Sequence, residues 1–214
     1  MLDFRLQTVA SFVRQGSRLA DIGTDHALLP CALVEKGHCP SAIASDIRVG
    51  PTEAARRSVS AAQLERQIDV RLGGGLDTVS PDEVEDIVIA GMGGETIAAI
   101  LEEAPWTKDR RYRLILQPMT RAEKLRRFLY ENGFSIEEER IADDGKRCYT
   151  VLCVSYTDTP FVPTDEECYV GKIPLPQGKP FLTRVCRALK KQQRVSETAA
   201  RCLAYIEEYI GESV

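Results

Sequence analysis

The sequence predicts an α/β protein with a mostly parallel sheet, an antiparallel hairpin at the end of that sheet and a small helical extension at the C-terminus. Three observations predict this fold class. Short apolar runs alternate with helix-length segments along the first 130 or so residues, the last two apolar runs flank the turn sequence "DDGK", and the composition changes after residue 156. The 214 residues, 43% of them hydrophobic, are enough for one core of ordinary size plus an appendage.

The apolar runs define seven expected strands. They cover residues 18–22, 41–45, 68–72, 86–90, 112–117, 134–140 and 148–156. The helical patterns between them cover residues 27–36, 52–63, 95–103 and 121–132. Strands separated by helices pair in parallel, with helices on both faces of the sheet. The last two strands are separated only by a turn, so we expect them to form an antiparallel hairpin.

The C-terminal part is expected to be a linker followed by helix. Residues 157–180 hold five prolines and one short helical pattern at 164–170, whereas residues 181–210 hold neither Gly nor Pro. In that last stretch a seam with spacings of three and four predicts a coiled-coil-like face, either one long helix or two helices joined near 194–197. We therefore expect a first domain at 1–158, a second at 159–214, and a monomer or a homodimer formed through the C-terminal helix. The seam consists of Leu182, Val185, Leu189, Gln192, Ser196, Ala199, Leu203, Ile206 and Ile210.

Composition excludes several classes of protein. The sequence has no run of 18 apolar residues, and Arg5 and Arg14 lie within an amphipathic N-terminal pattern, so neither a membrane span nor a signal peptide is expected and the location should be cytoplasmic. Seven scattered cysteines without a C-x-x-C pair predict reduced, mostly buried thiols and no metal site.

The net charge of −4 argues against nucleic-acid binding through bulk electrostatics. Two segments are nevertheless basic. Residues 105–127 hold eight Lys or Arg against two acids, and residues 179–194 hold six against none. By themselves these segments fit solvated faces as well as a nucleic-acid surface.

The stretch "LADIGTDHA", residues 19–27, crowds polar side chains at the end of an apolar strand. In such sheets a glycine turn at this position approaches the ligand closely. A pyrophosphate would be repelled by Asp21 and Asp25, whereas the ammonium and sulfonium of S-adenosylmethionine would be attracted. We therefore predict an S-adenosylmethionine site that includes Asp21, Gly23, Thr24, Asp25 and His26. The alternatives are that Asp25 only caps the next helix and that His26 is structural.

The ends of the next two strands fit a nucleoside. Asp46, followed by Ile47, comes 23 residues after Gly23, where an acidic side chain accepts the ribose hydroxyls of either S-adenosylmethionine or NAD. In "RLGGGL" the bare backbone of Gly73 and Gly74 would let an adenine lie against it, although such glycines also form ordinary turns.

The fourth strand ends in "AGMGGETI", in which Gly91, Met92 and Gly93 leave exposed backbone at the same edge. Thr96 stands where a dinucleotide fingerprint would have its third glycine. We predict that these three residues face the cofactor and a planar acceptor; a tight strand-to-helix turn is the alternative.

These motifs, in this order, resemble the bacterial tRNA (adenine-22-N1)-methyltransferase family. The likeness covers residues 1–156 and rests on "ADIGTDHA", "SDI", "RLGGGL", "AGMGGETI", "LILQPM", "LRRFLYENGFSI" and "DDGKRCYTVL". It implies a Rossmann-like class I methyltransferase domain with a helical, coiled-coil-like C-terminal domain, and an enzyme that methylates N1 of adenine 22 in tRNA. Three features depart from the family: Gly74 replaces a polar residue, Leu28 replaces a frequent tyrosine, and the C-terminal part is shorter.

The resemblance also implies roles for residues. Adenine N1 would attack the sulfonium methyl in line, so positioning should supply most of the rate. Asp25 would stabilise the cationic base that forms or help to remove a proton from its N6, while Gly91 and Met92 would hold the base through their backbone. The residues expected to bind the tRNA backbone are Arg110, Arg111, Arg121, Arg126, Lys190, Lys191 and Arg194.

The sequence leaves three other functions open. The protein would be a methyltransferase for another RNA, a small molecule or a protein; an RNA-binding module that keeps the pocket without catalysis; or a nicotinamide oxidoreductase, which the charges of Asp21 and Asp25 disfavour.

Overall fold

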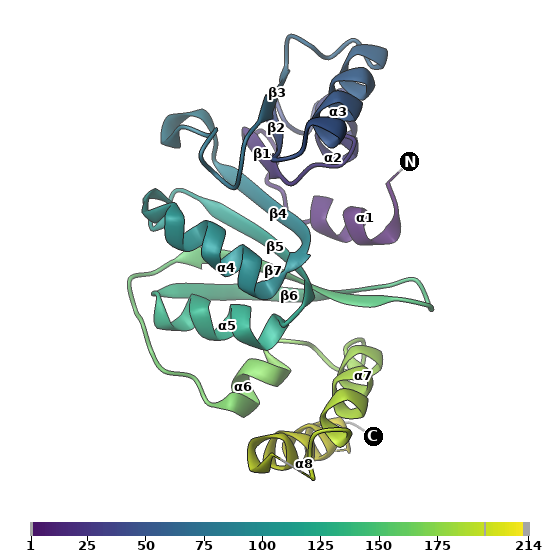
Figure 1. Cartoon of the computed structure of the whole chain (residues 1–214), viewed down its shortest axis with the longest axis vertical. Helices are drawn as coiled ribbons and strands as arrows, with labels where there is room; N and C mark the ends of the chain where they lie inside the picture. Colours follow the sequence, from purple (N-terminus) through teal and green to yellow (C-terminus); the bar gives the residue numbers. More distant parts are fainter. Residues whose placement is uncertain (1, 195, 212–214) are drawn as a thin grey trace.

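The computed structural model describes residues 2–194 and 196–211, and its centre is a seven-stranded sheet of order β3-β2-β1-β4-β5-β7-β6 (Figure 1). Strands β1 to β5 pair in parallel, whereas β7 runs antiparallel to both of its neighbours. The expected parallel sheet with a terminal antiparallel hairpin is confirmed. The strands are β1 (Leu19–Ile22), β2 (Ala42–Asp46), β3 (Ile68–Leu72), β4 (Asp86–Gly93), β5 (Arg113–Thr120), β6 (Phe134–Asp143) and β7 (Cys148–Tyr156).

Helices cover both faces of this sheet. The chain forms α1 (Phe4–Ala10), α2 (Leu28–Glu35), α3 (Val49–Ala61), α4 (Gly94–Glu103), α5 (Ala122–Glu131), α6 (Asp165–Val170), α7 (Lys179–Lys190) and α8 (Glu197–Gly211). Short 3₁₀ turns lie at Pro81–Glu83 and Pro105–Thr107. Apolar residues of α1, α2 and α3 are buried in one cluster with one side of the sheet, and those of α4 and α5 in a second cluster with the other side.

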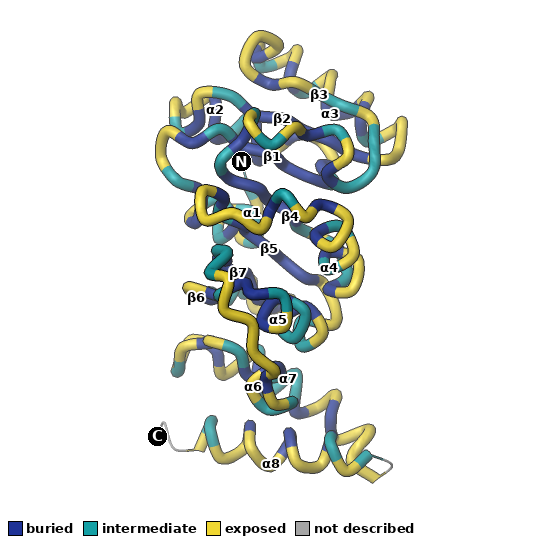
Figure 2. Tube along the Cα trace, turned by 90° about the vertical axis from the view of Figure 1, so that its left-hand side faces the viewer, coloured by how far each residue is buried: buried dark blue, intermediate teal, exposed yellow. Residues whose placement is uncertain are grey.

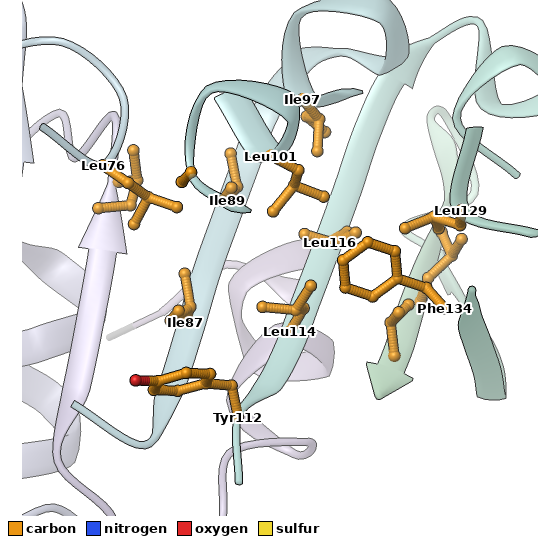
Figure 3. Close-up of a cluster of buried hydrophobic side chains, with 14 of the residues drawn as sticks. Leu76, Ile87, Ile89, Ile97, Leu101, Tyr112, Leu114, Leu116, Leu129 and Phe134 are labelled. Atoms are coloured by element: carbon orange, nitrogen blue, oxygen red, sulfur yellow. The ribbon is translucent and has the colours of Figure 1, made fainter. Parts of the chain in front are cut away.

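Alternation along each strand produces these two cores, because successive side chains of a strand point to opposite faces. Ile87 and Ile89 of β4 lie with α4 and α5, while Val88 between them lies with the opposite cluster. Figure 3 shows Ile97 and Leu101 of α4 directed at the same face as these isoleucines. Figure 2 shows the resulting pattern of buried strands and helices with exposed outer sides.

The C-terminal seam forms two helices and not one. Helix α7 ends at Lys190 and α8 begins at Glu197; Val195, within the expected joint, lies outside the described residues. The apolar positions of the seam pack against each other and against Val170 and Ile173, so the partner surface comes from the same chain. The coiled-coil character, the domain boundary at residue 158 and the oligomeric state stay predictions.

A buried ion pair links this C-terminal part to the sheet. Arg126 Nε of α5 donates to Glu139 Oε1 of β6 at 2.7 Å, and its Nη1 donates to the Cys168 carbonyl of α6 at 2.6 Å. Both side chains of the pair are almost completely buried. The prediction that Arg126 binds tRNA is therefore wrong: burial and these bonds commit its guanidinium to joining three elements.

The structure also bears on the expectations for cysteines, membrane spans and metal sites. All seven cysteines are free thiols, and six of them are buried, as expected. Across residues 2–194 and 196–211, no helix is long and apolar enough to cross a membrane. The same residues contain no cluster of His, Cys, Asp or Glu that could hold a metal ion.

Candidate cofactor and substrate site

A cavity of about 530 Å³ lies at the carboxyl ends of the parallel strands. Strand order reverses between β1 and β4, and the crevice at such a reversal is where sheets of this kind bind ligands. The wall comes from α1, the β1–α2 turn, the ends of β4 and β5, and the β6–β7 hairpin. Of the predicted cofactor residues, the cavity brings together Asp21, Gly23, Thr24, Asp25, His26 and Gly91.

Asp21 supplies a buried carboxylate to this wall. Only 7% of the residue is exposed. Burial raises the pKa of the Asp21 carboxyl to about 6, while a hydrogen bond from Thr24 and the charge of Arg5 act in the opposite direction. Burial outweighs its partners, so the charged carboxylate is under-compensated and would be stabilised by a cation in the cavity.

The turn after Asp21 requires its glycine. Gly23 has φ +76, and a Cβ there would come 2.1 Å from the Met92 Cε. The N–H groups of Gly23 and Thr24 both donate to the Ser45 carbonyl of β2, at 2.8 and 2.9 Å. Met92 thus covers the turn, which is itself fixed to the neighbouring strand.

Asp25 and His26 lie in the open part of the wall. Their side chains are 75% and 53% exposed, with Asp25 Oδ2 3.8 Å from His26 Nε2. Helix α2 has Ala27 at its N-cap position, so the interpretation of Asp25 as the helix cap is wrong. His26 is too exposed for a structural core histidine. Both side chains are free to meet a ligand.

Asp46 ends β2 beside the cavity. It is 4% exposed, and its Oδ1 accepts the Arg48 N–H at 2.8 Å and Arg48 Nε at 3.2 Å. Arg48 lines the cavity, whereas Asp46 does not. Ile47 is 71% exposed, and its Cδ1 would lie 3.3 Å from a Cβ at Gly74, so no larger residue fits at Gly74 without displacing it.

The structure does not bring all the predicted cofactor residues into the cavity wall. Those at the same sheet edge but outside the wall are Asp46, Ile47, Gly73, Gly74, Met92 and Gly93. Asp46 is hydrogen-bonded to Arg48, which lines the cavity, and Met92 lies against Gly23, which also lines it.

A buried glutamine connects three elements at the site, and sequence reasoning assigned it no role. Gln117 Oε1 accepts Arg5 Nη1 at 2.9 Å and the Gly91 N–H at 3.1 Å. Gln117 is fully buried, and Gly91 has φ +83. The signal available was a polar side chain inside the apolar strand of "LILQPM". No local pattern pointed to Arg5, which is 112 residues away from Gln117.

The β6–β7 hairpin closes the cavity from the side opposite the β1–α2 turn. The sequence predicted this hairpin but not its place in the cavity wall. Asp144, Arg147 and Tyr149 line it. Arg184 Nη2 of α7 donates to the Lys146 carbonyl at 3.0 Å, so the hairpin tip contacts the C-terminal helices.

The basic segment 105–127 does not form one surface. Arg110 and Arg111 precede β5, at the sheet edge opposite the cavity, where they bond to the Thr157 carbonyl and to Asp82 at 3.2 Å each. Arg121 follows β5, at the cavity edge, with a side chain that is 60% exposed. The prediction that Arg110 and Arg111 join Arg121 in one tRNA surface is wrong, because a strand separates them.

The second basic segment faces solvent. Lys190 Nζ pairs with Glu207 Oε1 of α8 at 2.8 Å, while Lys191 and Arg194 are exposed after the end of α7.

The fold and this cavity define a methyltransferase, and comparison with known proteins agrees. A family model described as a methyltransferase domain matches residues 2–152, and the chain belongs to that family. The chain is 41% identical over 157 residues to the tRNA (adenine(22)-N(1))-methyltransferase of Bacillus subtilis, covering 73% of this chain and 66% of that protein.

Solved structures narrow the assignment. The B. subtilis m1A22 tRNA methyltransferase TrmK superposes with a TM-score of 0.78 at 32% identity, covering 99% of this chain and 96% of that one. M. capricolum TrmK, solved with the cofactor product S-adenosyl-homocysteine, superposes with a TM-score of 0.82 at 25% identity, covering 100% of both chains. The chain belongs to the bacterial tRNA (adenine-22-N1)-methyltransferase family, as its motifs suggested.

Proposed function

We propose that the protein transfers a methyl group from S-adenosylmethionine to N1 of adenine 22 in tRNA. The observation that carries the cofactor assignment is the buried, under-compensated carboxylate of Asp21 in the wall of the cavity. The activities of the related proteins support the choice of acceptor.

The residues present fit this cofactor. Asp21 would pair with the ammonium group, because a cation offsets the desolvation of that carboxylate. Asp46 would accept the ribose hydroxyls, and Ile47 with Gly73 and Gly74 would border the adenine. S-adenosylmethionine, when bound, supplies an electrophilic methyl group on a sulfonium. A dinucleotide pyrophosphate would instead meet Asp21 and Asp25, which is why we do not favour a nicotinamide oxidoreductase.

The chain's own contribution to the reaction would be to position the acceptor base. Adenine N1 is already a nucleophile, so a fixed near-attack geometry supplies most of the acceleration. The Gly91 N–H donates to Gln117, so a contact from Gly91 to the base would use its carbonyl oxygen. Asp25, exposed at the mouth, would stabilise the positive charge that methylation places on the base.

The tRNA would approach the carboxyl edge of the sheet. Arg48 and Arg147 line the cavity, Arg121 lies beside it, and Lys191 and Arg194 follow α7. These cations would bind phosphates while the target adenine leaves its stack to enter the cavity. Residues 1–158 would carry the cofactor and 159–214 would add RNA contacts. A protein that modifies tRNA in a bacterium would work in the cytoplasm.

The test is methyl transfer from labelled S-adenosylmethionine to unmodified tRNA, followed by nucleoside analysis. We expect 1-methyladenosine, and we expect none from a tRNA whose adenine 22 is replaced by guanosine. Methylation at another position would correct the target. Cofactor binding by calorimetry without transfer to any tRNA would favour an RNA-binding module or another acceptor.

A further inference from the structure

A second cavity, of about 330 Å³, lies between the start of α5, the β6–β7 hairpin and α7. Met119 and Tyr149 line both this cavity and the first one. The two cavities are therefore separated by the unbranched, adaptable side chain of Met119 and by the aromatic ring of Tyr149. Met119 is 42% exposed. A ligand that occupies both cavities would therefore pass over these two residues.

The walls of the second cavity combine aromatic rings with positive charge. Tyr149, Tyr169 and Phe181 line it with partly exposed side chains. Arg121 and Arg184 line it as well, from the start of α5 and from α7. Rings and guanidinium groups together suit a planar base attached to a phosphate, because bases stack on aromatic faces and phosphates pair with arginine.

The charge balance favours an anionic ligand. Glu123 is the acid among the residues that line the cavity, and its Oε1 is 3.7 Å from Arg121 Nη1. Arg126 also lines the cavity, but its charge is neutralised by Glu139. Arg184 donates one hydrogen bond to the Lys146 carbonyl, which is a neutral partner and leaves the positive charge of Arg184 uncompensated. The remaining balance is positive.

We propose that this second cavity receives the nucleotide that directly flanks the target adenine in the tRNA strand. The inference rests on the proposed function, since it takes the first cavity as the place of the methylated base. Adjacent nucleotides are joined by one phosphodiester, so a base in each cavity would place that phosphate near the shared wall, within reach of Arg121 or Arg184. The cavity would hold the strand open and so help to keep the target base unstacked.

A pair of alanine-to-tryptophan variants tests this. Ala188 lines the second cavity from an exposed position on α7, so Ala188→Trp fills the space and removes no buried group. Ala200→Trp makes the same change on an exposed position of α8 and is the matched control. Loss of one stacked base corresponds to about tenfold or more in affinity. We expect Ala188→Trp to raise the KM for tRNA about tenfold and to leave S-adenosylmethionine binding, measured by calorimetry, unchanged.

Crosslinking gives a readout that does not depend on turnover. A photoreactive phenylalanine at position 188 should crosslink to unmodified tRNA at the nucleotide before or after adenine 22, as mapped by primer extension; the same residue at position 200 should not. Equal KM values for the two tryptophan variants, or crosslinks away from adenine 22, would overturn the proposal while wild-type methylation leaves the proposed function intact. Absence of wild-type methylation of any tRNA would overturn both.

Discussion

At the scale of single residues, the first cavity is distinguished by the buried carboxylate of Asp21 in its wall. Its carboxyl pKa rises from 3.8 to about 6 because it is buried. A raised pKa in the folded state means that protonated Asp21 stabilises the fold, and that this contribution is present below about pH 4 and lost as the pH rises through about 6. The cofactor-free protein therefore carries a destabilising charge at neutral pH.

Asp21→Asn should remove that destabilisation. We expect the free energy of unfolding of the cofactor-free variant to exceed that of the wild type at pH 7.5 by up to about 3 kcal/mol, since each pKa unit corresponds to about 1.4 kcal/mol. The gain should disappear near pH 4, where Asp21 is neutral. Urea unfolding at pH 4, 5.5 and 7.5 measures this, and a difference that does not change with pH would contradict it. The variant should also lose cofactor affinity.

Asp46→Ala should weaken S-adenosylmethionine binding by about tenfold or more, because it removes a charged acceptor for the ribose hydroxyls. Asp69→Ala on the neighbouring strand β3 is the control. Asp69 is exposed and pairs with Arg71 at the surface, so the Asp69→Ala variant should bind the cofactor with wild-type affinity. Calorimetric titration of both variants decides the matter. Wild-type affinity in Asp46→Ala would remove Asp46 from the site.

The residues that the sequence identified are those with a local signal. Asp21 and Gly23 stand within one strand-to-turn motif, and their proximity follows from their spacing. Arg5 and Gln117 meet only because α1 folds against the end of β5, and no periodicity encodes that contact. Arg126 was predicted wrongly for the same reason. Its basic neighbours in the sequence indicated a surface cation, whereas its buried partner Glu139 comes from another element and gives no local signal.

At the scale of elements, the sequence predicted the types of helices and strands better than the breaks between them. The expected ranges 68–72 and 148–156 coincide with β3 and β7. The seam at 181–210 allowed one helix or two, since spacings of three and four fit both. The buried cluster with Val170 and Ile173 explains the choice of two, because a folded-back pair covers its own apolar face.

The ion pair between α5 and β6 should matter more than any surface pair. Arg126→Met would leave the buried Glu139 carboxylate without its cation, and we expect a loss of about 3–5 kcal/mol in the free energy of unfolding. Lys190→Met removes a lysine that pairs with Glu207 at the surface, where both side chains are about half exposed, and should lower the free energy of unfolding far less. Urea unfolding of both compares them.

The double variant Arg126→Met with Glu139→Leu separates the two explanations for such a loss. It should recover a large part of the stability, because no uncompensated charge remains. If it is as unstable as Arg126→Met alone, packing and the bonds to α6 outweigh the ion pair.

At the scale of the whole molecule, the parallel sheet gives the protein two chemically different edges. The carboxyl edge holds the cavity and the hairpin with Arg147, and the amino edge holds Arg110. The sequence could not separate these cations, because β5 divides one continuous basic segment between the two edges. Their different positions make a direct test of where tRNA binds.

Arg147→Glu should weaken tRNA binding about tenfold at moderate salt and reduce the salt dependence of the affinity by about one phosphate contact. Arg110→Glu makes the same change of charge at the opposite edge, so its affinity and salt dependence should match those of the wild type. Filter binding of unmodified tRNA across a salt series gives both quantities, with urea unfolding as the check that each variant is folded. Equal losses in the two variants would show that net charge, and not the carboxyl edge, governs the association, because both variants change the net charge by the same amount.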